Sequence, residues 1–212
     1  MRTAALALGL LAAAPACRAE GPAPGAQCHY SYSVWNTKAR RSLTRRSVAK
    51  PASELRADEK GPLGCTPCEE DQVEVILSNG LAFKACRQAS ASLKEALDAA
   101  LTAGQRIETV LGYRAQMSKG PADKAGNRTQ LSNHAFGAAV DLNEAHNGLY
   151  SSCVSWSKSC KRIMGGRWDP RDPLSLGETS PAVIELGKVG FLWGGRIEGR
   201  QKDFMHFSPT GY

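Results

Sequence analysis

The 212-residue sequence predicts an α+β fold. Two observations support this: short strand patterns are mixed with two helix patterns, and they do not follow the strand–helix–strand rhythm of a parallel sheet. Hydrophobic residues make up 42% of the chain, which is enough for a globular core, and no internal repeat is found. We therefore expect one domain of ordinary size, residues 71–212, preceded by an extension over residues 20–70.

Residues 1–19 have the pattern of a signal peptide. Arg2 provides a positive start, residues 4–14 form a short apolar run, and small residues at 14–16 and at Ala19 could mark cleavage. The stretch before Cys17 loosely resembles a bacterial lipoprotein cleavage site, so lipidation at Cys17 is an alternative. No later segment approaches the roughly 18 apolar residues that a membrane span needs. We expect a secreted, periplasmic or cell-envelope protein without a transmembrane segment.

The extension is basic and rich in turn-forming residues. Residues 20–27 are rich in Gly, Pro and Ala, and residues 51–67 have no regular pattern. Residues 38–50 carry six cations and no acidic residue, which predicts a solvated loop or, alternatively, a surface that docks on a polyanion. Removal of the first 19 residues leaves a net charge of about +5, which suits an anionic cell-envelope surface. Nucleic acid would be the competing partner, but no nucleic-acid-binding motif is found, and we expect none.

Six cysteines remain after Cys17 is set aside, an even number that favours up to three disulfides in an exported chain. Cys153 and Cys160 are expected to pair. The other four, Cys28, Cys65, Cys68 and Cys86, allow three connectivities that the sequence does not rank. A redox pair, half of a zinc knuckle or a four-cysteine zinc site are the alternatives for these four.

Regular structure is predicted from residue 71 onward. Alternating apolar residues at 73, 75 and 77 predict a strand, and Asn79-Gly80 predicts a hairpin turn. Residues 81–83 could form the second strand of this hairpin. A capping box at residues 92–95 predicts the start of a helix that ends at Gly104. Further strands are expected at residues 107–113, 138–142 and 204–207. Ser180-Pro181 predicts the start of a second helix, which ends near Gly187 or Gly190.

Two of the four histidines, His134 and His206, are candidate metal ligands together with Asp141. Two imidazoles and one carboxylate make a three-ligand zinc site whose fourth position is open to water, and zinc lowers the pKa of that water from about 15.7 towards about 7. Asp203, three residues before His206, could then act as general base. In a regular strand Asp203 would face away from His206, so we expect a turn or irregularity there.

Three motifs in order resemble those of the LAS zinc metallopeptidases, the D-alanyl-D-alanine carboxypeptidases and L-alanyl-D-glutamate endopeptidases of bacterial cell walls. Residues 132–143 are similar to their S-x-H-x-x-G-x-A-x-D signature. Residues 191–195 and 202–207 resemble their closing segments, and residues 112–114 resemble their G-Y-R strand end. The resemblance implies a small central antiparallel sheet flanked by helices, of the hedgehog/DD-peptidase type. It also implies one catalytic zinc ion and hydrolysis of peptidoglycan stem peptides.

Carried over by position, the resemblance implies that His134, Asp141 and His206 bind zinc and that Asp203 is the acid/base. It implies that Arg114 binds the substrate carbonyl or stabilises the oxyanion, and that Ser132 lies near the substrate. The closing segments look closer to the endopeptidase branch, but the bond cleaved stays open between the two activities. We expect a monomer.

Two other functions fit the sequence. The domain could be a non-catalytic, zinc-containing module that binds the cell wall, or a disulfide-stapled structural protein without zinc. His146 is expected to be a loop residue and not a ligand. Trp193 could line the cleft or pack in the core, whereas Trp156 and Trp168 are expected to anchor surface loops.

Overall fold

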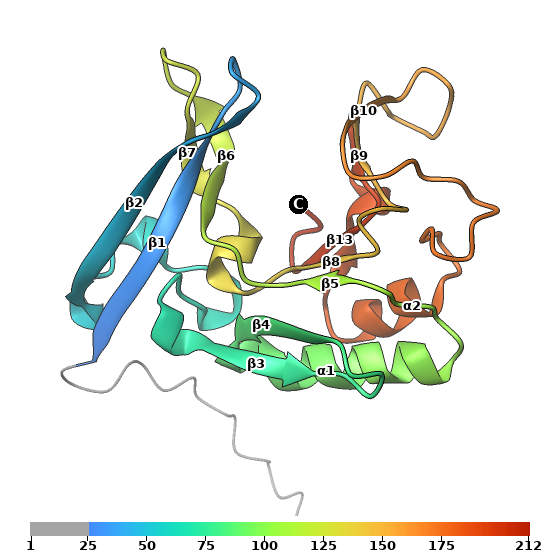
Figure 1. The fold of residues 1–212 in the computed structure, drawn as a ribbon, viewed down its shortest axis with the longest axis horizontal. Coiled ribbons are helices and arrows are strands. Elements are labelled where there is room, and N and C mark those ends of the chain that lie inside the picture. The colour runs from blue at the N-terminus through green and yellow to red at the C-terminus, as the bar shows by residue number, and fades with distance from the viewer. Residues whose placement is uncertain (1–25) are drawn as a thin grey trace, which may run out of the picture.

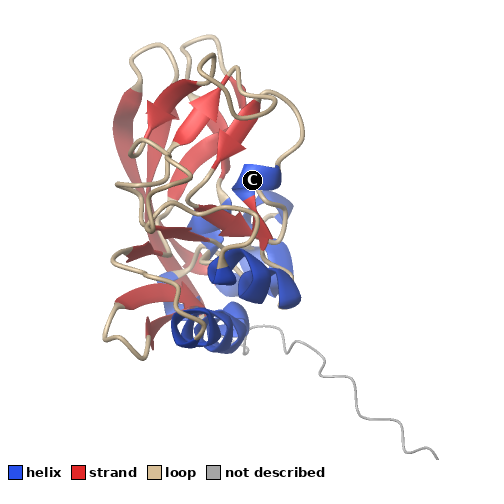
Figure 2. Ribbon diagram, turned by 90° about the vertical axis from the view of Figure 1, so that its right-hand side faces the viewer, coloured by secondary structure: helices blue, strands red, loops and turns tan. Residues whose placement is uncertain are grey.

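The computed structural model describes residues 26–212. The expected signal peptide, Cys17 and most of the Gly/Pro-rich lead lie outside the described residues. Within the described part, strands outnumber helices and form several small sheets beside two α-helices, so the predicted α+β class is confirmed. Figure 2 shows the strands gathered on one side and the helices on the other. Among residues 26–212, no helix combines the length and apolar character needed to cross a bilayer.

The N-terminal sheet has the strand order β2-β1-β6-β7. Its strands are β1 (Gln27–Asn36), β2 (Arg41–Pro51), β6 (Gln116–Ala122) and β7 (Arg128–Leu131). Strand β1 pairs antiparallel with β2 and parallel with β6 (Figure 1). On β1, buried residues alternate with more exposed ones, because one face packs on a second small core under this sheet.

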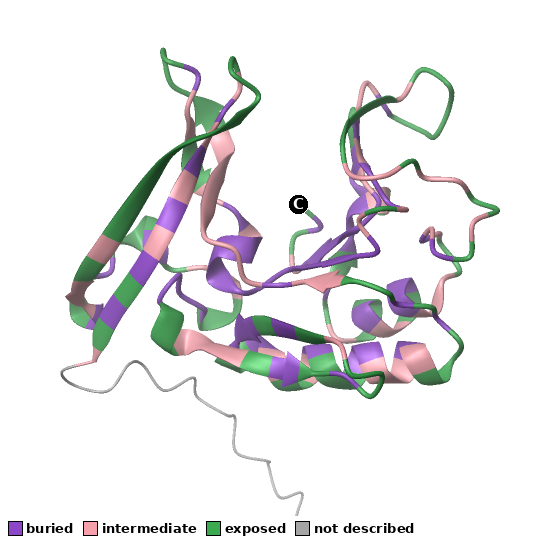
Figure 3. Cartoon of the chain, viewed as in Figure 1, coloured by how far each residue is buried: buried purple, intermediate pink, exposed green. Residues whose placement is uncertain are grey.

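The prediction of a loop over residues 38–50 is wrong, because residues 41–51 form strand β2. This strand lies at the edge of the sheet, and residues 41–47 are exposed on both of its faces (Figure 3). A strand is predicted from the alternation of apolar and polar residues, and a strand without a buried face lacks this alternation. The basic residues of β2 therefore predicted a loop. The predicted solvent exposure is confirmed for the cations at positions 38, 40, 41, 45 and 46, whereas Lys50 is partly buried and pairs with Glu59.

A second sheet lies at the centre of the molecule and has the order β11-β13-β8-β5 with all pairs antiparallel. Its strands are very short: β5 (Val110–Leu111), β8 (Val140–Leu142), β11 (Leu192–Trp193) and β13 (His206–Ser208). The strands expected at residues 107–113 and 138–142 are present but shorter. The main core lies between this sheet and the helices α1 (Arg87–Thr102) and α2 (Pro181–Lys188).

The hairpin of β3 (Gln72–Ile76) and β4 (Ala82–Cys86) forms as predicted, with its turn at Asn79-Gly80. Helix α1, however, begins at Arg87 and not at residue 92, so the predicted capping box is wrong. The chain passes directly from β4 into the helix at Cys86, and the buried stripe already includes Ala89. Helix α2 begins at Pro181 as predicted.

A third sheet has the order β10-β9-β12 and consists of β9 (Leu149–Ser151), β10 (Lys161–Met164) and β12 (Gln201–Asp203). The final strand was predicted at residues 204–207, but β12 ends at Asp203 and β13 begins at His206. The two residues between them form a bend, which is the irregularity expected beside Asp203.

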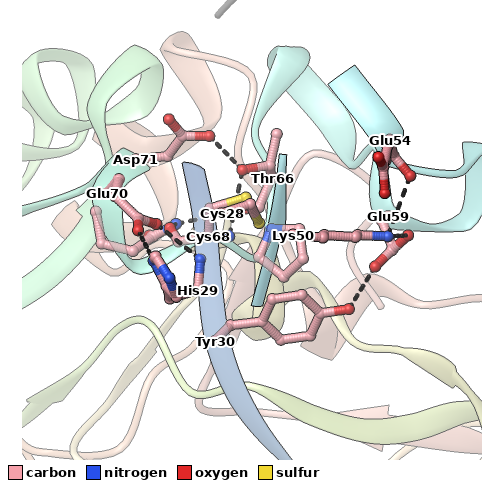
Figure 4. The surroundings of a disulfide bond; sticks show 12 residues. Cys28, His29, Tyr30, Lys50, Glu54, Glu59, Thr66, Cys68, Glu70 and Asp71 are labelled. Carbon is pink, nitrogen blue, oxygen red and sulfur yellow. Dashed lines mark hydrogen bonds and ion pairs between the residues drawn. A yellow bond between two sulfur atoms is a disulfide. The ribbon is translucent and has the colours of Figure 1, made fainter. Parts of the chain in front are cut away.

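Three disulfides join Cys28 to Cys68, Cys65 to Cys86 and Cys153 to Cys160. The pairing of Cys153 with Cys160 is confirmed, and the redox and zinc alternatives for the other four cysteines are wrong. The disulfide Cys28–Cys68 joins β1 to the turn that contains Cys68, which lies between two short 3-10 segments (Figure 4). The short 3-10 segments of the described residues are Ala52–Glu54, Ala57–Glu59, Pro62–Gly64, Glu69–Asp71, Asn133–Phe136 and Gly194–Arg196.

Candidate metal centre

A cleft of about 320 Å³ lies above the central sheet. In Figure 1 the sheet with β1, β2, β6 and β7 stands on the left of this region, β9 and β10 stand on the right, and β5, β8 and β13 run between them. The floor of the cleft includes His134, Asp141, Asp203, Met205 and His206. The left wall includes Trp35, Arg114, Gln116, Ser118, Lys119 and Arg128, and the right wall Leu149, Ile163 and Met164.

Two of the candidate ligands are placed by strand register. Asp141 on β8 lies directly opposite His206 on β13, and both side chains are buried. Directly opposed residues in an antiparallel pair point to the same face, so the carboxylate and the imidazole meet without any special loop geometry. The register of β8 and β13 therefore brings two of the three candidate ligands together.

The third candidate, His134, comes from a 3-10 turn (Asn133–Phe136) that precedes β8. The turn ends at Gly137, whose φ of 63° lies in the left-handed region that favours glycine. A Cβ at this position would come within 2.5 Å of the backbone nitrogen of Cys86. Glycine therefore lets the chain turn from the histidine into β8 while it packs against the end of β4.

The three ligand atoms converge closely. Oδ1 of Asp141 lies 3.0 Å from Nε2 of His134 and 3.0 Å from Nδ1 of His206, and the two imidazole nitrogens lie 3.1 Å apart. Zinc with bonds of about 2.0–2.1 Å in tetrahedral geometry separates its ligand atoms by about 3.3 Å. These residues therefore form a cluster that could hold a metal ion, and only a small expansion would be needed.

The imidazole of His134 is oriented by the backbone. Its Nδ1 lies 2.8 Å from the carbonyl oxygen of Gly112, which suits a donated N–H and leaves Nε2 free to face the cluster. Gly112 itself is packed so tightly against β4 that a Cβ would lie 2.1 Å from the carbonyl oxygen of Lys84. The glycine of the Gly112–Arg114 motif thus permits the close approach that fixes the histidine.

Electrostatics also favour a cation in this cluster. Burial opposes ionisation of Asp141, but the charges and hydrogen bonds of His134 and His206 hold its pKa well below the usual range. The pKa of His206 is raised, because its hydrogen bond and charge interaction with Asp141 outweigh its burial. Two imidazoles and a permanently ionised carboxylate are the donor set of a catalytic zinc site.

Asp203 lies beside this cluster at the end of β12 and lines the cleft. Burial, with a contribution from the charge of Asp141, raises its pKa to about 6, although His206, His134 and Lys119 act in the opposite direction. Such a carboxyl group exchanges a proton near neutral pH, which suits general acid–base chemistry.

Unpaired polar atoms concentrate at the cleft. Among the described residues, six buried side-chain nitrogen or oxygen atoms have no hydrogen-bond partner, and five of them belong to cleft-lining residues. These five are Nε of Arg114, Nε of Arg128, Oγ of Ser132, Oδ1 of Asp203 and Nε2 of His206. Because buried polar groups are normally paired, such a concentration is typical of a site that binds water, an ion or a substrate.

All six residues predicted for the site lie in the same cleft: Arg114, Ser132, His134, Asp141, Asp203 and His206. His146 lies outside it, with Nδ1 2.7 Å from Oδ2 of Asp172, and is not part of the metal cluster. Trp193 is buried and belongs to the core, where its Nε1 donates to the carbonyl oxygen of Phe204.

Sequence patterns missed Trp35, Lys119 and Arg128 as cleft residues. Their positions depend on the pairing of β1 with β6 and of β6 with β7, and no local sequence motif predicts these pairings. Trp156 and Trp168 lie away from the cleft, with ring centroids 4.9 Å apart, and Trp168 stacks on Phe204. They join a cluster that anchors the segment closed by the disulfide Cys153–Cys160, as expected.

Comparison with known families agrees with this geometry. Residues 125–209 match the family model described as D-alanyl-D-alanine carboxypeptidase. The matched segment contains His134, Asp141, Asp203 and His206, so the resemblance indicated by the motifs is confirmed, and this part of the chain is similar to a peptidase domain. No curated protein and no solved structure matches the chain. The hedgehog-like details of the fold therefore stay a prediction.

Proposed function

We propose that this chain is a zinc-dependent peptidase that hydrolyses peptidoglycan stem peptides. The observation that carries the proposal is the convergence of three ligand atoms within 3.0–3.1 Å beside an unpaired carboxylate, inside the segment that matches the peptidase family. His134, Asp141 and His206 would hold one zinc ion. When bound, zinc polarises a carbonyl group and lowers the pKa of a water molecule from about 15.7 to about 7.

Asp203 is the general base in this proposal. Its Oδ1 is buried and has no partner among residues 26–212, so it is free to accept a proton from the attacking water and to return it to the leaving amine. A pKa of about 6 keeps most of the group ionised at neutral pH, yet basic enough to take the proton.

Arg114 and Ser132 complete the proposed catalytic machinery. Both line the cleft, and Nε of Arg114 and Oγ of Ser132 have no hydrogen-bond partner among the described residues. The guanidinium of Arg114 would stabilise negative charge that develops on the carbonyl oxygen of the substrate, because it is a fixed cation that lines the cleft. The hydroxyl of Ser132 would form a hydrogen bond to the substrate next to the scissile bond.

The bond that is cleaved is either L-alanyl-D-glutamate or D-alanyl-D-alanine. The closing motifs favour the former, whereas the description of the matching family model names the latter activity. Mass spectrometry of the products released from purified peptidoglycan distinguishes the two. Cleavage of D-alanyl-D-alanine releases a single D-alanine, whereas cleavage of L-alanyl-D-glutamate separates the first residue of the stem from the second.

Metal analysis of matched histidine variants tests the proposal. The wild-type protein should bind one zinc per chain and cleave defined muropeptides. His134→Ala should lose both zinc and turnover, because it removes one of three ligands. His146→Ala should keep both, because His146 lies outside the metal cluster. A wild-type protein that binds no zinc and cleaves no muropeptide would sink the proposal.

A non-catalytic module that binds the cell wall is the second candidate. It is favoured by β2, an edge strand on which Arg41, Arg45 and Arg46 are exposed. The variant Asp203→Ala separates the two candidates. Binding to sacculi should survive this change in both cases, but only an enzyme would lose turnover. The three disulfides fit an exported protein, and fractionation of the native cells would locate it.

A further inference from the structure

Two cations of the β6–β7 hairpin, Lys119 and Arg128, line the cleft and have no role in the proposed reaction. Lys119 lies upstream of the segment that matches the peptidase family, and neither residue belongs to the motifs that identified the site. Together with Arg114 they make one wall of the cleft positively charged.

The register of the hairpin explains why both cations face the cleft. Met117 pairs with Leu131, and these two side chains pack against the small core on the far face of the sheet. The next pair is Lys119 with Gln130, because a β-bulge inserts one extra residue between positions 117 and 119. Side chains alternate along β7, so Gln130 and Arg128 lie on the cleft face, and Lys119 shares that face with them.

Neither cation has an anionic partner in the part of the chain that the structure describes. No carboxylate there lies within salt-bridge distance of either residue, whereas Lys50, Arg56, Lys94, Arg106, Lys188 and Arg196 each have one. Nη1 of Arg128 donates to the carbonyl oxygen of Gly120 at 2.5 Å, but its buried Nε is unpaired. The ammonium of Lys119 lies over the ring of Tyr212, at 5.6 Å from the centroid.

Both residues are partly withdrawn from solvent, which makes an unpaired charge unfavourable until an anion arrives. Lys119 lines the same cleft as Asp141, Asp203 and His206, so its charge lies near the proposed reaction centre. An anion held by Lys119 would therefore belong to the part of the substrate next to the scissile bond.

We propose that Lys119, supported by Arg128, forms a carboxylate-binding subsite that selects peptides with a free carboxylate beside the scissile amide. The inference rests on the proposed peptidase function and adds a determinant of its substrate class. In a stem peptide the carboxylate can come from two sources, the C-terminal residue or the α-carboxylate of a γ-linked D-glutamate. Both are planar anions that an ammonium and a guanidinium bind through charge-assisted hydrogen bonds.

Binding to the zinc-loaded Asp203→Asn protein tests this without turnover. The probes are L-Ala-γ-D-Glu-L-Lys, with each carboxylate either free or amidated, and L-Lys-D-Ala-D-Ala with a free or amidated C-terminus. Amidation of the recognised carboxylate should weaken binding roughly 10- to 100-fold, as expected for loss of a hydrogen bond between charged groups. The carboxylate whose amidation has this effect identifies the source.

Substitutions then assign the effect to the subsite. Lys119→Met should remove the discrimination between acid and amide, and Lys119→Arg should restore most of it. Lys124→Met is the matched control, because Lys124 is an exposed lysine of the same hairpin whose side chain does not line the cleft. Circular dichroism and zinc content verify that each variant is folded and loaded.

Each outcome separates this inference from the proposed function. Discrimination that disappears in Lys119→Met but not in Lys124→Met supports the subsite, even if the wild-type protein hydrolyses none of the probes. Equal binding and equal hydrolysis of acid and amide by the wild-type protein would overturn the subsite and leave the peptidase intact. A loss of discrimination that is the same in the Lys119 and Lys124 variants would also overturn it.

Discussion

Glu59, under the N-terminal sheet, and Asp203, in the cleft, both hold carboxylate oxygens away from solvent, but their surroundings are opposite. Oε1 of Glu59 accepts a hydrogen bond from the hydroxyl of Tyr30 at 2.5 Å, and its Oε2 accepts one from Nζ of Lys50 at 2.6 Å and one from the backbone nitrogen of Arg56 at 3.0 Å (Figure 4). Oδ1 of Asp203 has no partner among the described residues.

The pKa values follow this difference. Burial opposes ionisation of Glu59, but its hydrogen bonds with Lys50, Tyr30 and Arg56 lower its pKa. Burial raises the pKa of Asp203 to about 6 because no equivalent donors offset it. A saturated carboxylate stabilises a fold, whereas an unsaturated one is available for chemistry. The same contrast separates the contacts of Glu59 under the N-terminal sheet, which stabilise the fold, from the cleft on the other face of that sheet, where polar atoms are left unpaired.

The largest effect that tests this comparison is on turnover. Asp203→Ala should lower kcat by about 10²- to 10⁴-fold, because it removes the proposed general base. Its zinc content and melting temperature should stay close to those of wild type, since no hydrogen bond is lost. Glu198→Ala, which removes an exposed carboxylate just before β12, is the control and should remain active. Turnover that survives in Asp203→Ala would contradict the assignment.

The next effect is on stability. Glu59→Gln should reduce the free energy of unfolding by about 2–4 kcal/mol, because it breaks a buried ion pair and leaves Lys50 without its counterion. The folded fraction should keep the wild-type kcat. Asp58→Asn, at an exposed neighbour that pairs only with Arg56, should change stability by less than about 1 kcal/mol. Urea denaturation measures both variants, and equal losses would contradict the role of Glu59.

The smallest effect is a change of the free energy of unfolding with pH in the zinc-free protein, and the two carboxyl groups should give it opposite signs. The folded pKa of Asp203 is above its unfolded value of about 3.9, so wild type should lose stability relative to Asp203→Asn as pH rises from about 4 to 6. The folded pKa of Glu59 is below its unfolded value of about 4.3, so its stabilisation is complete above that pH and is lost as pH falls through the folded pKa. Denaturation curves between pH 3 and 7 should therefore show opposite slopes, and slopes of the same sign would break the comparison.

The candidate site was more predictable from the sequence than the fold around it. The candidate ligands lie in segments where a glycine, a small-residue strand and an apolar strand each constrain the chain locally, and the resemblance of these ordered motifs to the LAS peptidases pointed to His134, Asp141 and His206. Asp203 followed from the same segment, together with the bend that the structure shows between β12 and β13.

The missed features depend on contacts between distant parts of the chain. Strand β2 has no buried face, so its pairing with β1 left no apolar pattern in its sequence. The early start of α1 follows from its continuity with β4 at Cys86, which is bonded to Cys65. The cleft-facing cation Lys119 depends on a bulge in strand pairing, which single-sequence patterns do not reveal.

The hydrogen bond between His134 and the carbonyl oxygen of Gly112 has a genetic consequence. A side-chain partner could be deleted by a single codon change, whereas every amino acid carries a backbone carbonyl. Variation can therefore disturb this contact only by moving the chain, and the tight packing of Gly112 on β4 makes that glycine the sensitive position. The orientation of the His134 imidazole thus depends on Gly112 having no side chain.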